Sequence, residues 1–461
     1  MNTRRYPNTN QYLKGGNPMD GKATDPRRAF PAKAGAASLA IAGAVGAADG
    51  GPLATAPGVR PPRKERLMDL TDLTDLMDKA GELFDAGDFD AADASYRQIL
   101  SRDPDHVAAL AQHAYIALLA NRLPAAERLL KRVLRLDPGH TRSLSNLANA
   151  LWRADAYAEL ADLLPRVKAD APTATPEQLR SFAGRRPYTI SGPETARIPF
   201  AASDPLPMVE ASVNGAPPEL FFLDTGALFA LNQDYADRLG IPMYGHTTGK
   251  TLYGEHEAYQ GRVDRLAMGE LGIGDLPVHT IPDTIRITAP DGRATQGAIG
   301  TSVLSRFLST IDYPDQALVL RQNTRAHIRA RHSAPMWFLG DHYLLSHGTV
   351  NGLDRMVFFV DTGGGDIGFT APRTTFDAAG ITIPPGEGFH QVTVETVTLG
   401  SATRRQVPSL AGAFPGWFEH GFGFRIGGLP THAFFKPYAL TFDFARMRVL
   451  MDPMRADPRS A

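Results

Sequence analysis

The chain of 461 residues is long enough for about three folding units, and its 43% hydrophobic and 21% charged residues are ordinary for globular protein. Its 48 basic and 49 acidic side chains give a net charge of -1, which provides no overall attraction to nucleic acid or an anionic membrane. Because the sequence has no cysteine, disulfides, thiolate metal sites and cysteine nucleophiles are excluded, and any catalysis must use carboxylates, hydroxyls, histidines or lysines.

Residues 1–62 are predicted to be either a disordered tail or an export signal. Arg27 and Arg28 are followed by Lys33 and by an uncharged stretch from 34 to 48, an order that resembles a twin-arginine export signal. Export would place the protein in the periplasm, and a cytoplasmic location is the alternative. No apolar run in this segment reaches the roughly 18 residues of a membrane span, so we expect no integral membrane segment.

Residues 70–180 carry a helical repeat with a period of 34 residues. Asp103-Pro104-Asp105-His106 recurs as Asp137-Pro138-Gly139-His140, and apolar residues stand at helical spacing between these motifs. This pattern resembles tetratricopeptide repeats, which are paired helices stacked into an array. It weakens around Pro172, as expected where an array docks onto another domain. The array is predicted either to bind a peptide or partner protein or to serve as a structural extension.

The rest of the chain changes to short β-rich runs and contains an internal duplication. Val213-Asn214-Gly215 and Phe222–Gly226 recur in register as Val350-Asn351-Gly352 and Phe359–Gly363, each offset by 137 residues. In both copies Asn-Gly predicts a tight hairpin, and the apolar run that follows predicts a buried strand ending in Asp-Thr-Gly.

The duplication continues downstream with small changes of offset. We pair Ala298-Ile299-Gly300 with Arg425-Ile426-Gly427, and Ile311-Asp312-Tyr313 with Phe442-Asp443-Phe444 as the final strands. One chance Asp-Thr-Gly in a chain of this length has a probability near ~0.1 from average residue usage. Two copies, each placed behind a buried strand, are therefore poorly explained by coincidence.

This order of elements resembles a retropepsin-type aspartic protease, and two copies in one chain resemble the two-lobed pepsin arrangement. The implied fold is multidomain: α-helical tetratricopeptide repeats followed by an all-β bilobal aspartic protease fold. Its two retropepsin-like lobes are predicted at 190–325 and 335–455.

The resemblance implies that Asp224 and Asp361 form a catalytic dyad, with no metal and no cofactor. Two such carboxyls about 3 Å apart cannot both ionise, so the pair holds one proton. The ionised group would take a proton from a water that attacks the peptide carbonyl, and the protonated group would donate to the developing oxyanion.

Four further residues are expected to support the two loops. Thr225 and Thr362 would cross-link them through hydroxyl-to-backbone hydrogen bonds, as the resemblance implies. Gly226 and Gly363 would leave room for the water and the substrate backbone.

The residues after these glycines, Ala227 and Gly364, carry no hydroxyl, whereas pepsins place a hydroxyl donor there. With fewer donors to the carboxylate, we expect an activity optimum nearer pH ~5–6 than pH ~2. Residues His246 to Arg262 lie where the family has its flap hairpin, with Tyr253 and Gly254 as a possible tip. An ordinary solvent-exposed hairpin is the alternative.

The leading functional hypothesis is an aspartic endopeptidase that acts on a peptide or protein substrate, with the helical repeats as a platform. The alternative is a non-catalytic scaffold that presents peptides or partners on the same fold. We expect the chain to act as a monomer because it contains both lobes, although pairing of each lobe with its copy in a second chain stays open.

Overall fold

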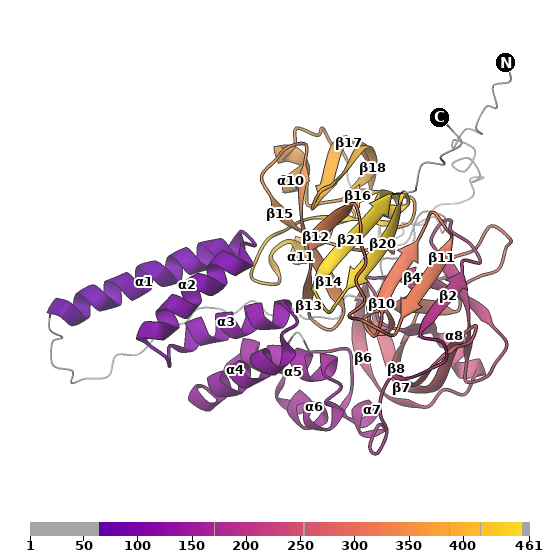
Figure 1. Ribbon diagram of the computed structural model, residues 1–461, viewed down its shortest axis with the longest axis horizontal. Helices are drawn as coiled ribbons and strands as arrows, with labels where there is room; N and C mark the ends of the chain where they lie inside the picture. Colours follow the sequence, from indigo (N-terminus) through magenta and orange to yellow (C-terminus); the bar gives the residue numbers. More distant parts are fainter. Residues whose placement is uncertain (1–63, 170, 252–253, 387, 415, 454–461) are drawn as a thin grey trace, which may run out of the picture. The chain divides into compact units, whose positions relative to one another are not determined.

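The computed structural model describes residues 64–453 apart from 170, 252–253, 387 and 415 (Figure 1). The predicted tail or export signal at 1–62 and the predicted flap residue Tyr253 lie outside the described residues. A helical region is followed by a β-rich region with two barrels. No helix in the described ranges combines the length and apolar character that crossing a membrane requires.

The helical region is a series of antiparallel helix pairs that contact one another in chain order (Figure 1). Its elements are α1 (Lys64–Asp85), α2 (Phe89–Arg102), α3 (Val107–Leu119), α4 (Leu123–Leu136), α5 (Thr141–Arg153), α6 (Tyr157–Leu163), a 3-10 turn (Leu164–Arg166) and α7 (Pro176–Arg180). The repeated motif forms the connections: the His106 side chain accepts from the Ala109 amide at 3.2 Å, and His140 accepts from the Ser143 amide at 3.2 Å. Each histidine therefore caps the helix that follows it.

The first β lobe is a closed six-stranded barrel with strands paired in the ring order β3-β4-β9-β5-β8-β7. The strands are β3 (Met208–Val213), β4 (Glu219–Asp224), β5 (Ala230–Asn232), β7 (Gly254–Met268), β8 (Leu271–Ile281) and β9 (Gly297–Gly300). Strands β1 (Thr189–Ser191) and β6 (Met243–Thr251) add to its edges, and helices α8 (Gln233–Arg238) and α9 (Thr301–Leu304) follow β5 and β9.

The second β lobe repeats this ring as β14-β15-β19-β16-β18-β17. The strands are β14 (Tyr343–Val350), β15 (Met356–Phe359), β16 (Phe369–Thr370), β17 (His390–Leu399), β18 (Ala402–Ala411) and β19 (Ile426–Pro430). Strand β13 (Trp337–Leu339) pairs with β14, and helices α10 (Arg373–Ala378), α11 (Gly416–His420) and α12 (His432–Phe435) complete the lobe. The two predicted retropepsin-like lobes are thus closed barrels of the same topology.

A six-stranded sheet built from both halves joins the lobes, which the sequence did not predict. Its order is β12 (His332–Pro335), β21 (Arg448–Pro453), β20 (Tyr438–Asp443), β10 (Leu308–Asp312), β11 (Ala317–Arg321) and β2 (Thr195–Pro199). The predicted final strands, β10 and β20, pair at its centre, where the hydroxyl oxygens of Thr310 and Thr441 lie 2.8 Å apart. These threonines occupy equivalent positions in the two halves, so a pseudo-twofold axis passes between them.

The predicted match of Ala298-Ile299-Gly300 with Arg425-Ile426-Gly427 is wrong. Ala298 pairs with Ala230 in β5, whereas Leu429 pairs with Thr370 at the equivalent place in β16. The equivalent segments are therefore Gly297–Gly300 and Gly428–Thr431, which each lead into a short helix. The second lobe has Leu429-Pro430-Thr431 at this place, which shares no residue with Ala298-Ile299-Gly300 of the first lobe.

The helical array shares an apolar core with the second lobe. Phe89 packs against Trp337 and Phe424 with ring centroids 5.1 and 5.0 Å apart. The Nε2 atom of His347 lies 2.9 Å from the Gly87 carbonyl oxygen, in the turn between α1 and α2. One surface of the helical array therefore packs against the second β lobe.

Candidate active site

The two Asp-Thr-Gly loops lie together at the junction of the lobes. Strand β4 ends at Asp224, and β15 ends two residues before Asp361. Both aspartates are 0% exposed. The Oδ1 atom of Asp224 accepts a hydrogen bond from the Gly226 amide at 2.7 Å, and Oδ1 of Asp361 accepts from the Gly363 amide at 2.6 Å. One oxygen of each carboxyl is thus held by its own loop.

Four hydrogen bonds made by the two threonines lock the loops to each other. The Thr225 amide donates to the Thr362 hydroxyl and the Thr362 amide donates to the Thr225 hydroxyl, both at 3.0 Å. Each hydroxyl then donates across the junction, that of Thr225 to the Val360 carbonyl at 3.0 Å and that of Thr362 to the Leu223 carbonyl at 3.3 Å. Because both threonines are fully buried, these bonds are shielded from water and fix the relative position of the two aspartates.

Each carboxyl packs directly on the glycine of the opposite loop. A Cβ atom on Gly363 would lie 2.4 Å from Oδ2 of Asp224, and one on Gly226 would lie 2.9 Å from Oδ2 of Asp361. No real side chain fits at 2.4 Å, so glycine at 363 is required by close approach. The two carboxyls are therefore neighbours, which is the arrangement in which they compete for one proton.

The two lobes differ in which of two facing positions carries a side chain. In the first lobe, Ala227 has a side chain and Gly300 has none, and a Cβ on Gly300 would lie 2.0 Å from the Ala227 carbonyl oxygen. In the second lobe, Thr431 has the side chain, and a Cβ on Gly364 would lie 2.4 Å from that of Thr431. The side chain of Thr431 therefore requires glycine at 364.

Two buried tyrosines stand in the field of both aspartates. Burial raises the pKa of Tyr313, and the charges of Asp361 and Asp224 raise it further. Burial likewise raises the pKa of Tyr343, followed by the charges of Asp341, Asp361 and Asp224. Both phenols are therefore neutral at ordinary pH, and they add no negative charge beside the two aspartates.

A buried Asp341–His342 pair touches the first Asp-Thr-Gly loop and was missed by sequence reasoning. The Nδ1 atom of His342 lies 2.6 Å from Oδ1 of Asp341, and its Nε2 atom lies 3.1 Å from the Gly226 carbonyl oxygen. The pair immediately precedes β14, and in the duplicated register it corresponds to Asp204-Pro205. This alignment of the two copies was the only sequence signal for the pair, and it was weak because the aspartate occurs in both copies but the histidine does not.

The predicted flap segment is a long hairpin of β6 and β7, which begins its second strand at Gly254. The segment after the helical array braces its base. The Thr175 hydroxyl donates to the Tyr244 carbonyl at 2.8 Å, and the side-chain Nε2 of Gln178 donates to the backbone carbonyls of Gly261 and Val278 at 2.7 and 3.1 Å. The base of the hairpin is therefore fixed.

Burial lowers the pKa of several histidines in the two β lobes. Burial lowers the pKa of His279, on β8, to about 3, and His342 contributes to the same shift. Burial also lowers the pKa of His256 on the hairpin strand β7. At the start of α12, burial lowers the pKa of His432 to about 3.

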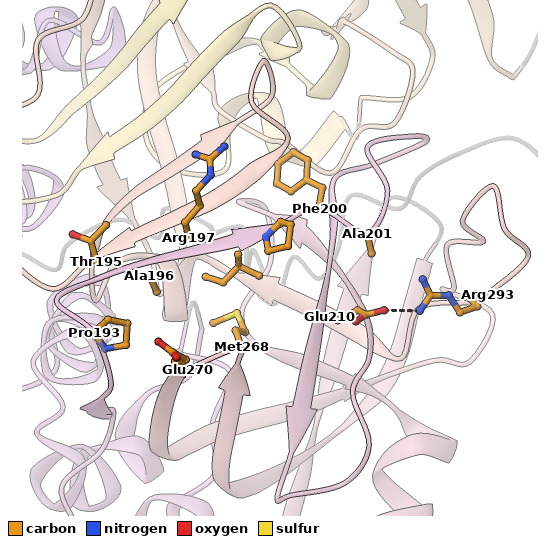
Figure 2. A pocket seen from close by; sticks show the side chains of 13 residues that line it. Pro193, Thr195, Ala196, Arg197, Phe200, Ala201, Glu210, Met268, Glu270 and Arg293 are labelled. Carbon is orange, nitrogen blue, oxygen red and sulfur yellow. Dashed lines mark hydrogen bonds and ion pairs between the residues drawn. The ribbon is translucent and has the colours of Figure 1, made fainter.

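No group of three or more metal-ligating side chains that could hold an ion occurs in the described parts of the chain. A groove lies elsewhere, along β2, beside β3 and the turn between β7 and β8 of the first lobe (Figure 2). Its wall includes the ion pair of Arg293 with Glu210, at 2.7 Å, and none of the predicted site residues lines it. The groove is therefore separate from the dyad.

Comparison with known families agrees with this architecture in chain order. A family model described as a tetratricopeptide repeat matches residues 83–148, and one described as an aspartyl protease matches residues 209–303. The second range runs from β3 to α9 and includes the Asp224 loop and the β6–β7 hairpin. A search of curated proteins gave no significant match to the chain.

Proposed function

Since the chain combines tetratricopeptide repeats with an aspartyl protease domain, we propose that it is an aspartic endopeptidase whose catalytic dyad is Asp224 and Asp361. The observation that carries this proposal is the reciprocal packing of each carboxyl on the glycine of the other loop. It supports a site in which two carboxyls share a proton, which is the state that can act as base and acid at once.

The chemistry follows from the two protonation states of the pair. The ionised carboxyl takes a proton from a water molecule, and the resulting hydroxide attacks the peptide carbonyl carbon. The protonated carboxyl donates to the carbonyl oxygen, giving a neutral tetrahedral intermediate. When the C–N bond breaks, the proton first taken from water passes to the leaving amine. One hydroxyl of the intermediate returns its proton to the other carboxyl as the carbonyl forms again, and the dyad is back in its starting state.

A substrate reaches the dyad only after a covering segment moves, because both aspartates are 0% exposed. We propose the β6–β7 hairpin as that segment. Since Thr175 and Gln178 fix its base, the motion would be confined to the end nearer Gly254. Closure over a bound peptide would then exclude bulk water from the reaction.

The test is cleavage of a mixed peptide library by the full-length chain between pH 4 and 7, with mass-spectrometric identification of products. Asp224→Asn and Asp361→Asn should each reduce cleavage by several orders of magnitude, because neither variant can hold the shared proton in a matched pair. Asp354→Asn, at an exposed turn position, is the matched control and should cleave like the parent.

The same experiment distinguishes the enzyme from the alternative, a non-catalytic scaffold. The enclosed position of the two aspartates would favour the scaffold. A scaffold predicts no cleavage by the parent chain at any pH, together with peptide binding that survives both substitutions. Equal cleavage by the parent and both variants would instead show that the hydrolysis comes from elsewhere.

We also propose that the helical array binds a protein partner through a surface that the second lobe does not cover. Tetratricopeptide repeats support such a role in general terms. Crosslinking of the full-length chain in its host extract should label partners on α4, where Leu136 is 43% exposed. Labelling confined to the β lobes would contradict a partner site on the array.

For location, we propose export directed by Arg27 and Arg28, which the uncharged stretch at 34–48 supports. A reporter fused after residue 62 should reach the periplasm, and replacement of both arginines by lysine should retain it in the cytoplasm. Equal export of both fusions would remove the twin-arginine interpretation.

A further inference from the structure

The Asp341–His342 pair forms a continuous hydrogen-bonded connection between three parts of the chain. The Thr173 amide, in the segment after the helical array, donates to Oδ2 of Asp341 at 2.9 Å. Oδ1 of the same carboxyl binds Nδ1 of His342, and Nε2 of that ring meets the Gly226 carbonyl oxygen in the other lobe. Asp341 is 5% exposed and His342 is 1% exposed, so water does not compete for these bonds.

The partners of the ring determine where its hydrogens must be. A carbonyl oxygen can only accept, so the contact of Nε2 with Gly226 requires a hydrogen on Nε2. Oδ2 of Asp341 already accepts from a backbone amide, and the short contact at Nδ1 needs one further hydrogen between the ring and Oδ1. The bonded geometry therefore holds one proton more than a neutral histidine beside an ionised aspartate.

The surroundings of the pair favour an ionised Asp341. Burial raises the pKa of Asp341, but the charge and hydrogen bond of His342 and the bond from Thr173 lower it to a net value below the ordinary range. Arg153 on α5 and His279 on β8 interact electrostatically with Asp341, and the ring of Tyr343 lies 3.9 Å from that of His342. Of these neighbours, only Arg153 carries a charge at neutral pH, because His279 and Tyr343 are held neutral by burial.

We propose that His342 is a positioning residue for the first catalytic loop, held in its donating state by Asp341. Gly226 has no side chain to restrict its backbone, so a hydrogen bond to its carbonyl limits the conformations of the loop that carries Asp224. The support acts on one loop only, since the equivalent residue of the first lobe is Pro205, whose ring offers no donor. This inference rests on the proposed function, because it assigns His342 a part in that reaction.

Two substitutions separate positioning from a structural role. His342→Phe keeps a planar ring but removes both donors, and should lower kcat at least ~10-fold while KM changes less than ~2-fold, the expected loss for one buried hydrogen bond used in the transition state. Asp341→Asn should keep most of the activity. Its side-chain oxygen can accept from Thr173 and its amide can donate to Nδ1, which leaves the required hydrogen on Nε2.

His342→Gln is the conservative rescue, since its amide can still donate toward Gly226, and it should recover part of the lost kcat. His327→Phe, the same change at an exposed histidine between the lobes, is the matched control. Unchanged kcat in a folded His342→Phe chain, or a loss confined to KM, would overturn the proposal.

Nitrogen-15 NMR of the histidine rings in the full-length chain supplies a readout that needs no protease activity. The His342 signal, assigned by its loss in His342→Gln, should show a hydrogen on Nε2 in the parent chain and in Asp341→Asn. A bare Nε2 in the parent chain would overturn the proposal even if cleavage is normal. Absence of cleavage with the expected NMR signature would count against the proposed function and leave the geometry of the pair supported.

Discussion

Two buried histidines should make the fold sensitive to acid. His279 is 2% exposed and His432 is 0% exposed, and burial lowers the pKa of each to about 3 from an ordinary value of 6.5. Between these two values the unfolded chain binds a proton at each histidine, whereas the folded chain does not. Protonation therefore favours unfolding as the pH falls through this window.

The magnitude follows from linkage. Each histidine makes the free energy of unfolding fall by about 1.4 kcal/mol for every pH unit below 6.5, until the folded pKa near 3 is reached. From pH 6.5 to 4.5 the two residues together remove about 5 kcal/mol, which is comparable with the whole stability of many domains. This effect, independent of the dyad, also opposes an activity optimum near pH ~2.

The assay is urea unfolding of the full-length chain at several pH values between 4.5 and 7. His279→Gln should shift the absolute stability by an amount set by local packing, but its slope against pH should be shallower than that of the parent by about 1.4 kcal/mol per pH unit. His327→Gln, at an exposed position, should leave the slope unchanged.

Parallel lines for the parent and His279→Gln would refute this reasoning, because they would mean that His279 titrates equally in the folded and unfolded chains. A steeper slope in the variant would refute it as well. The comparison uses slopes, so a loss of packing caused by the substitution cannot imitate the expected result.

Three further changes test the loops and the docking of the helices. Thr362→Val removes a buried hydroxyl that both accepts and donates across the junction, and should cost about 1–3 kcal/mol in urea unfolding, with Thr362→Ser restoring most of it. Gly363→Ala places a methyl group 2.4 Å from Oδ2 of Asp224 and should abolish peptide cleavage; full activity would contradict the packing of the dyad. Arg306→Met breaks the paired bonds to Asp155, at 2.6 and 2.8 Å, and should lower the unfolding midpoint of the helical region, which circular dichroism at 222 nm would follow.

Local patterns predicted the parts of the fold that depend on neighbours in the chain. The Asp-Pro-x-His motifs become helix connections because each histidine caps the helix that begins at the next residue, accepting from the amide three residues later. The Asn-Gly turns lie between the strands that they were expected to join, since both residues adopt the left-handed backbone in each copy, as at Asn214 and Gly215. Such features depend on only a few adjacent residues, so the sequence predicts them.

What the sequence did not reveal depends on contacts between distant segments. The shared sheet pairs Thr310 with Thr441, 131 residues apart. No local sequence pattern predicts that β10 pairs with β20. The segment that runs from β19 into Thr431 was misaligned because Ile-Gly occurs in both halves of the sequence, whereas the backbone equivalent in the second half is Leu-Pro-Thr. His342 was missed because its role comes from Gly226, which lies in the other lobe.

The residues that face the two Asp-Thr-Gly loops restrict the order in which substitutions could accumulate in this protein. A side chain at 364 would collide with Thr431, so a change such as Gly364→Ser is tolerated only after residue 431 has been reduced to glycine. Gly300 is restricted differently in the first lobe, because a side chain at 300 would meet the backbone carbonyl of Ala227, which no substitution at 227 removes. Only the pair of 364 and 431 is thus an epistatic unit. A loop transplanted from the first lobe to the second, which would put alanine at 364, should function only when residue 431 is changed to glycine as well.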